Sequence, residues 1–149
     1  MSILANHEAA FARLEQTAKR FDERQLTEIR DPAGWSAKDH LMHVALWEQT
    51  LLASVEGRPR HQALGVDAST DDSSDWDAIN ALIQAKTKDR KLADVLETLR
   101  RTHAETRARL AAAELDSSSD AAKKLLADAP GYTEHYDQHR GWIEELVAR

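Results

Sequence analysis

Apolar residues recur at steps of three and four along nearly the whole chain, and no stretch alternates apolar and polar residues as a half-buried strand does. Only five glycines and three prolines interrupt the 149 residues. A chain with this spacing buries its apolar stripes by packing helix against helix. The pattern predicts an all-α protein, and the length fits one domain over residues 1–149, an antiparallel four-helix bundle.

Interruptions of the spacing predict where the helices begin and end. A first helix is expected over about 5–24, with Asn6 as its N-cap. The sequence SAKD matches a capping box that starts a second helix at Ser36, and this helix ends near Glu56, before a Gly-Arg-Pro stop signal. A polar loop follows to Asp75, which is expected to cap the next helix. The remaining helices are predicted over about 76–88, 91–113, 120–127 and 132–148, the last two separated by Pro130-Gly131.

Charge and composition exclude several classes of function. The net charge of −6 argues against a dedicated nucleic-acid-binding protein and against binding to an anionic membrane surface. No apolar run exceeds four residues, whereas a membrane span needs about 20. The start, MSILANHEAA, lacks the basic and apolar regions of a secretion signal, so a cytoplasmic location is expected.

The chain has no cysteine but seven histidines. The lack of thiols excludes disulfides, thiolate zinc sites, iron–sulfur clusters and a cysteine nucleophile. Imidazole is then the soft-metal ligand that remains.

Two of the histidines lie on the apolar stripe of the predicted last helix. At about 100° per residue, His135 and His139 are one turn apart, and their side chains can converge on one point. Such a pair is half of a site for zinc or a similar ion. Otherwise both are core histidines satisfied by a hydroxyl or carboxylate, and the pattern alone leaves both interpretations open. His103, on the stripe of the 91–113 helix, is likewise either a further ligand or a satisfied core residue.

The predicted second helix carries a carboxylate near the middle of its apolar arc. Glu48 is costly there unless it is paired or metal-bound, so it is a ligand, a partner that orients a ligand, a general base, or half of an interhelical salt bridge. His43 and Trp47 lie together at one edge of this arc. His40, in the first turn after the cap, is expected at the surface. Met42, Leu46 and Ala53 form a smaller stripe on the back of the helix, which contacts either a neighbouring helix or a second copy of the chain.

Residues 35–48, WSAKDHLMHVALWE, resemble the second helix of the DinB/YfiT-like superfamily. Residues 132–143, YTEHYDQHRGWI, resemble the HxxxH motif in its last helix. The segment WDAIN from Trp76 is similar to the branch that contains the colibactin self-resistance protein.

The resemblance implies a four-helix bundle, frequently a homodimer, with a three-histidine metal site. The resemblance implies that the metal ligands in this sequence are His43, His135 and His139. Zinc or nickel is the usual divalent ion, and iron is compatible with an all-imidazole site. The activities of the superfamily include thiol-dependent transfer and isomerisation, and self-resistance hydrolysis.

The first functional hypothesis is therefore a metal-dependent hydrolase or thiol-dependent transferase in detoxification, stress response or self-resistance. It would act on a small-molecule substrate, and any low-molecular-weight thiol would come from outside the cysteine-free chain. Glu48 is the candidate base, and Trp47 and Trp142 either line a substrate pocket or pack within the bundle. The alternatives are a protein that binds and sequesters a small molecule without turnover, and a metal-stabilised structural dimer.

Overall fold

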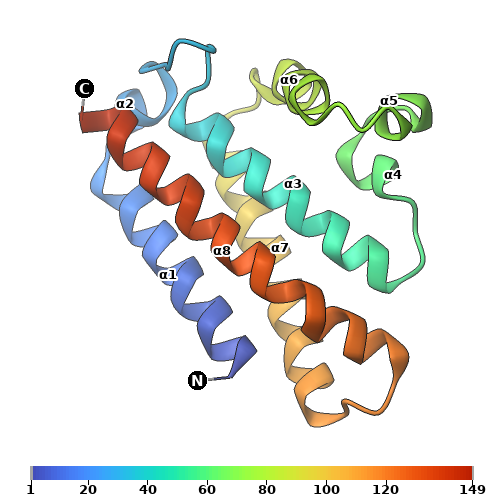
Figure 1. Cartoon of the computed structure of the whole chain (residues 1–149). Helices are drawn as coiled ribbons and strands as arrows, with labels where there is room; N and C mark the ends of the chain where they lie inside the picture. Colours follow the sequence, from blue (N-terminus) through green and yellow to red (C-terminus); the bar gives the residue numbers. More distant parts are fainter. Residues whose placement is uncertain (1, 149) are drawn as a thin grey trace.

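The computed structural model describes residues 2–148, and every regular element among them is a helix (Figure 1). The all-α class is thereby confirmed. One isolated β-bridge, between Arg30 and Ser36, pins the connection before the second long helix. The helices are α1 (Ile3–Arg20), α2 (Glu23–Thr27), α3 (Ala37–Val55), α4 (Arg60–Leu64), α5 (Ala68–Asp72), α6 (Trp76–Thr87), α7 (Leu92–Leu115) and α8 (Asp120–Ala148).

The four long helices α1, α3, α7 and α8 form the bundle (Figure 1). Helices α1 and α8 run parallel, because Arg13 pairs with Asp137 and Arg20 pairs with Glu144 further along both helices. Helices α3 and α7 are also parallel, and they run opposite to the first pair (Figure 1). The predicted antiparallel packing therefore holds between the two pairs and not within them. A parallel α3–α7 pair requires a long crossover, which α4, α5 and α6 provide.

The first helix differs from its predicted bounds at both ends. Ser2, not Asn6, is the N-cap of α1, since its side chain accepts a hydrogen bond from the N–H of Ala5 at 3.0 Å. The helix stops at Arg20 because Asp22 forms a capping box with Gln25, which starts α2 in a new direction.

The predicted start of α3 is confirmed. The Ser36 hydroxyl accepts from the Asp39 N–H, and the Asp39 carboxylate accepts from the Ser36 N–H at 2.9 Å. The stripe of Met42, Leu46 and Ala53 is buried among residues of the same chain. It therefore contacts neighbouring helices and offers no surface to a second copy.

The predicted polar loop up to Asp75 holds two short helices, α4 and α5. Leu64 and Val66 anchor this segment in the core, which explains why it folds despite its polar composition. Asp75 caps α6 as expected, with its side chain accepting from the N–H of Ala78 at 3.1 Å.

Helix α8 runs unbroken through Pro130, so the predicted break at Pro130-Gly131 is wrong. Proline removes one backbone donor and strains the preceding turn, but neighbouring side chains can hold the helix together. Leu125 and Ala129 do so here, since they are buried against Leu51 and Leu110 of other helices. The continuity matters because α8 carries both histidines of the HxxxH motif.

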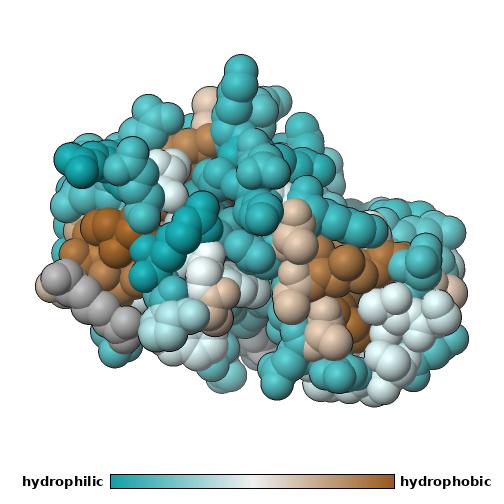
Figure 2. Space-filling view, turned by 90° about the horizontal axis from the view of Figure 1, so that it is seen from above, coloured by the Kyte–Doolittle hydropathy of each residue, from teal (hydrophilic) through white to brown (hydrophobic). Residues whose placement is uncertain are grey.

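The face seen from above is mainly hydrophilic, with hydrophobic residues gathered in separate patches (Figure 2). Within residues 2–148, no helix combines the length and apolar character needed to cross a membrane. Trp142 of α8 is one of the large apolar side chains that remain exposed, at 43%. Its position beside the histidines is described below.

Candidate metal centre

The antiparallel packing of α3 against α8 brings His43, His135 and His139 together. One ring nitrogen from each lies within 4.8 Å of the other two. The Nε2 atoms of His43 and His135 are 3.3 Å apart, and the ring centroids of His135 and His139 are 4.5 Å apart. The structure therefore juxtaposes the three residues that the resemblance singled out.

All three imidazoles are neutral at physiological pH. Burial lowers the pKa of His43 to about 3, with His135 and His40 adding to the effect. Burial alone lowers the pKa of His135 to about 4. Burial and the neighbouring imidazoles hold the pKa of His139 still further below its usual range. Neutral rings keep the lone pairs that metal binding requires.

The donor set fits a divalent metal ion. The Nε2 atoms of buried His43 and partly buried His135 face each other, and the third imidazole lies beside them. Each neutral ring keeps one nitrogen lone pair that can bind a metal ion. The Nδ1 of His43 is buried and has no hydrogen-bond partner within the described part of the chain. Imidazole clusters of this kind suit zinc, nickel and iron.

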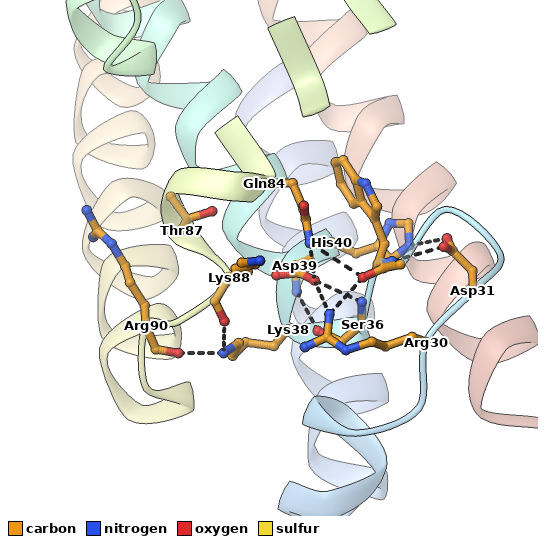
Figure 3. Close-up of polar contacts among 12 residues, drawn as sticks. Arg30, Asp31, Ser36, Lys38, Asp39, His40, Gln84, Thr87, Lys88 and Arg90 are labelled. Atoms are coloured by element: carbon orange, nitrogen blue, oxygen red, sulfur yellow. Dashed lines mark hydrogen bonds and ion pairs between the residues drawn. The ribbon is translucent and has the colours of Figure 1, made fainter. Parts of the chain in front are cut away.

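His40 is buried, which corrects its predicted place at the surface. Its Nδ1 lies 2.8 Å from the Nδ1 of His139. Its Nε2 lies 3.9 Å from a carboxylate oxygen of Asp31 (Figure 3). Burial lowers the pKa of His40, while Asp31 and Asp39 oppose that shift. His40 is therefore the polar neighbour of His139 outside the three-histidine group.

A hydrogen-bond network fixes the loop between α2 and α3 beside His40 (Figure 3). The buried Asp39 carboxylate accepts from Arg30 at 3.3 Å and from Gln84 at 3.2 Å, in addition to its capping bond. Arg30 also donates to the carbonyl of Gly34 at 2.7 Å. The loop cannot drift without breaking these bonds, so Asp31 keeps its place beside His40.

The α6–α7 turn is tied to the same end of α3. The Nζ of Lys38 donates to the carbonyl oxygens of Lys88 and Arg90, at 2.7 and 2.5 Å (Figure 3). The two carbonyls of this turn satisfy the buried ammonium group, which stabilises the junction.

A pocket of about 510 Å³ opens beside the histidines, within the size range of small-molecule sites. Its walls include two indole rings, those of Trp35 and Trp142. The Trp142 ring lies 4.7 Å from the ring of His139, and the Trp35 ring lies 5.3 Å from the ring of His43. Trp142 thus stands at the wall of a cavity and not in the bundle core.

Trp47 lies elsewhere. Its indole N–H donates to Asn80 at 3.0 Å, and its ring packs edge-on against Trp76. It lines a second hollow with Tyr132 and His135, and its ring centroid lies 6.2 Å from that of His43.

Glu48 does not line the pocket beside the histidines. Its carboxylate is fully buried, with one oxygen 2.8 Å from the Nε2 of His7 and the other accepting a hydrogen bond from the Tyr136 hydroxyl. Burial and the nearby Glu48 charge raise the pKa of Tyr136 well above its usual value. Of the roles considered for Glu48, these contacts support that of a polar partner that links neighbouring helices.

His7 is a buried polar residue that the sequence analysis left unassigned. Its Nδ1 lies 3.1 Å from the Thr133 hydroxyl, and its Nε2 lies 2.8 Å from the Glu48 carboxylate without the geometry of a hydrogen bond. A signal was available, because position 7 precedes Ala10 and Leu14 at helical steps of three and four. His103 stacks on Phe11 with ring centroids 3.8 Å apart and lies outside the three-histidine group.

The family model of the DinB superfamily matches residues 6–143. The match includes all of α3, the part of α8 up to Ile143 and all three histidines, and the chain belongs to this superfamily. The match is to the superfamily as a whole, and membership of the colibactin self-resistance branch stays a prediction. Comparisons with curated proteins and with solved structures gave no match.

Proposed function

We propose that His43, His135 and His139 bind one divalent metal ion, zinc or nickel, and that the chain is a metal-dependent enzyme acting on a small molecule. The reaction is hydrolysis or thiol-dependent transfer, in detoxification or stress response. One observation carries the proposal: three neutral imidazoles present nitrogens within 4.8 Å of one another beside a pocket of about 510 Å³.

The arrangement favours a catalytic over a structural ion. Structural zinc sites are closed by four protein ligands, whereas catalytic sites have three and leave a position open. Here three imidazoles meet at a pocket lined by Trp35 and Trp142, where a substrate has access. A divalent ion held by these three imidazoles would act as a Lewis acid and lower the pKa of a bound water or thiol nucleophile.

The residues around the site have separate tasks. His40 holds the Nδ1 of His139, which fixes the orientation of that ring and leaves its other nitrogen free to bind metal. Trp35 and Trp142 exclude water from a bound substrate. Glu48 holds α1, α3 and α8 together through His7 and Tyr136, so we assign it a positioning role and not proton transfer.

The test is turnover of a thiol with an electrophile. The untagged chain, loaded with zinc or nickel, is incubated with cysteamine and 1-chloro-2,4-dinitrobenzene, and formation of the thioether with release of chloride is followed. We expect a rate above the uncatalysed reaction that falls to background after chelation and in His135→Ala. The control His61→Ala, a histidine outside the cluster, should keep the activity. Binding without product in the metal-loaded chain, for this and a panel of hydrolysable esters, would favour sequestration and contradict the proposed enzyme.

A further inference from the structure

We propose that the site takes an elongated small molecule that carries a polar, metal-binding group in its interior and an aromatic or apolar group at each end. This inference rests on the proposed function, because it takes the same three histidines as the place where the interior group is held. It adds the shape and the chemical class of the substrate.

Two hollows of similar size meet at the candidate metal centre. The first is the pocket beside the histidines. The second hollow, which Trp47 and Tyr132 line, also has a volume of about 510 Å³. His135 and Gln138, which are three residues apart on α8, line both. The two hollows are therefore neighbours that share one wall, and a metal ligand is part of that wall.

The lining residues follow the same order along both helices. On α8, residues 131–138 line the second hollow and residues 135–146 line the pocket. On α3, which lies antiparallel beside α8, the order is reversed: His43 lines the pocket and Trp47 lines the second hollow (Figure 1). The two hollows thus form one groove along the α3–α8 seam. Residues 131–146 span about 22 Å of helix at 1.5 Å per residue.

The three candidate metal ligands lie in the interior of this groove and not at one of its ends. His135 belongs to both hollows, and its Nε2 lies 3.3 Å from that of His43. A divalent ion bound there prefers an atom with a lone pair over an apolar group. A ligand that fills the whole groove therefore needs its metal-binding group in the middle of the molecule.

Aromatic rings lie on both sides of the histidines. On the side of the pocket, the Trp142 ring lies 4.7 Å from the ring of His139, and 43% of Trp142 is exposed. On the side of the second hollow, the Trp47 ring lies 6.2 Å from the ring of His43. Indole rings bind aromatic and apolar groups through their faces and edges. Each end of the groove therefore suits such a group, a short distance from the metal-binding atom.

The rings of the second hollow are held in place by hydrogen bonds. The indole N–H of Trp47 donates to Asn80 at 3.0 Å, and Asn80 itself lines the pocket. The Tyr132 hydroxyl lies 3.0 Å from the Thr50 hydroxyl. Both rings are thus oriented by neighbouring helices before a ligand binds. A preformed surface loses little conformational entropy on binding, so the second hollow can add to the affinity.

The test uses hydroxamic acids, whose oxygen atoms bind zinc, with a ring on neither, one or both sides. The probes are acetohydroxamic acid, phenylacetohydroxamic acid, N-benzylacetohydroxamic acid and N-benzyl-2-phenylacetohydroxamic acid. Each is titrated into the zinc-loaded protein by calorimetry. We expect the two-ring compound to bind at least about tenfold more tightly than either one-ring compound, because the second ring is buried in the other hollow. Binding no tighter than the better one-ring compound would overturn the proposal.

A matched pair of glycine variants locates the second ring. Gly131 and Gly141 both lie in α8, and a Cβ at either position meets no atom within 4 Å, but only Gly131 lines the second hollow. Gly131→Leu should fill this hollow and remove most of the tenfold gain, whereas Gly141→Leu should keep it. Trp142→Ala, at the other end of the groove, should also reduce the gain. The full gain in folded Gly131→Leu would overturn the assignment of the second hollow.

A second titration separates this inference from the proposed metal. Chelator-treated protein is titrated with N-benzyl-2-phenylacetamide, N-benzylacetamide and 2-phenylacetamide, which carry the same rings without the hydroxamate oxygen. If zinc and acetohydroxamic acid bind but a second ring adds nothing in either series, this inference alone fails. If no zinc binds and the two-ring amide still binds more tightly than both one-ring amides, the proposed metal chemistry alone fails and the two-ended groove stands.

Discussion

His40 connects the candidate metal centre to the rest of the molecule. One of its ring nitrogens contacts His139 and the other faces Asp31, which the loop network fixes in turn. Polar neighbours of metal-ligating histidines set the tautomer and the orientation of the ring. The orientation of the His139 ring therefore depends on a residue outside the three-histidine group.

Replacing His40 by phenylalanine should weaken metal binding. The ring volume is kept, but the contact to the Nδ1 of His139 is lost, and we expect the dissociation constant for zinc to rise about 10- to 100-fold. Competition with a chromophoric chelator measures this constant. His61→Phe is the matched control, since His61 has no place in the cluster. An unchanged dissociation constant in folded His40→Phe would contradict the positioning role.

The sequence revealed the three clustered histidines but not their polar surroundings. His135 and His139 are visible from their spacing alone, and His43 from the resemblance. The burial of His40 depends on the fold of the preceding loop, which no local pattern encodes. The partner of Glu48 was equally inaccessible, because His7 lies 41 positions away on another helix.

At the scale of the element, α8 has two polar faces with different tasks. His135 and His139 face the pocket, while Tyr136, between them in sequence, donates its hydroxyl hydrogen bond to the buried Glu48 of α3. This bond fixes the rotation of α8 about its axis relative to α3. It therefore supports the histidines without contacting a ligand.

Tyr136→Phe should lower the free energy of unfolding by about 2 kcal/mol, because it deprives a buried carboxylate of one hydrogen bond. Tyr132→Phe is the matched control on the same helix. Its hydroxyl contacts that of Thr50 at 3.0 Å at a less buried position, and we expect a loss of about 1 kcal/mol or less. Urea unfolding of the metal-free proteins measures both. A loss in Tyr136→Phe no larger than in Tyr132→Phe would contradict this role for Glu48.

Helix existence was predictable here and helix ends were less so. Strong local signals located the Ser36 cap of α3 and the Asp75 cap of α6. The continuity of α8 through Pro130 was missed because tertiary packing of Leu125 and Ala129 overrides the local preference of proline. The short helices α4 and α5 were missed for a related reason: isolated five-residue helices are unstable without the core contacts that hold them.

At the scale of the whole molecule, the directions of the helices determine where the candidate metal centre forms. Helix α1 runs parallel to α8, and α3 runs parallel to α7 (Figure 1). The crossover through α4, α5 and α6 allows α3 to lie antiparallel to α8 while α7 covers its other side (Figure 1). This antiparallel contact brings the first half of α3 against the second half of α8, where His40 and His43 meet His139 and His135. Chain direction in a bundle is set by connections and packing, so periodicity predicted the helices and not their relative directions.

The fold also buries histidines in their neutral form, and this makes the free energy of unfolding depend on pH. His103 packs on Phe11, and burial, together with His7 and Arg107, lowers its pKa from 6.5 to about 4, while Glu15 opposes the shift. As the pH falls below 6.5, the unfolded chain takes up a proton first. The neutral, buried His103 therefore costs no folding stability above pH 6.5, and the free energy of unfolding falls as the pH drops from 6.5 towards 4.

His103→Leu should flatten this dependence. We expect the loss of unfolding free energy between pH 7 and pH 5, measured by urea unfolding of the metal-free protein, to be smaller than in the wild type by up to about 2 kcal/mol. The half-buried His61 of α4 provides the control, and His61→Leu should keep the wild-type slope. Identical slopes in all three proteins would show that His103 does not titrate as its burial implies.

The most direct test of the account is the metal content of the untagged chain after reconstitution with zinc or nickel and gel filtration. We predict one ion per chain in the wild type, and a large loss of bound metal in His43→Ala, His135→Ala and His139→Ala, with His61→Ala unchanged. A wild-type content far below one ion per chain, or full content in His135→Ala, would contradict the central claim that these three imidazoles form a metal centre.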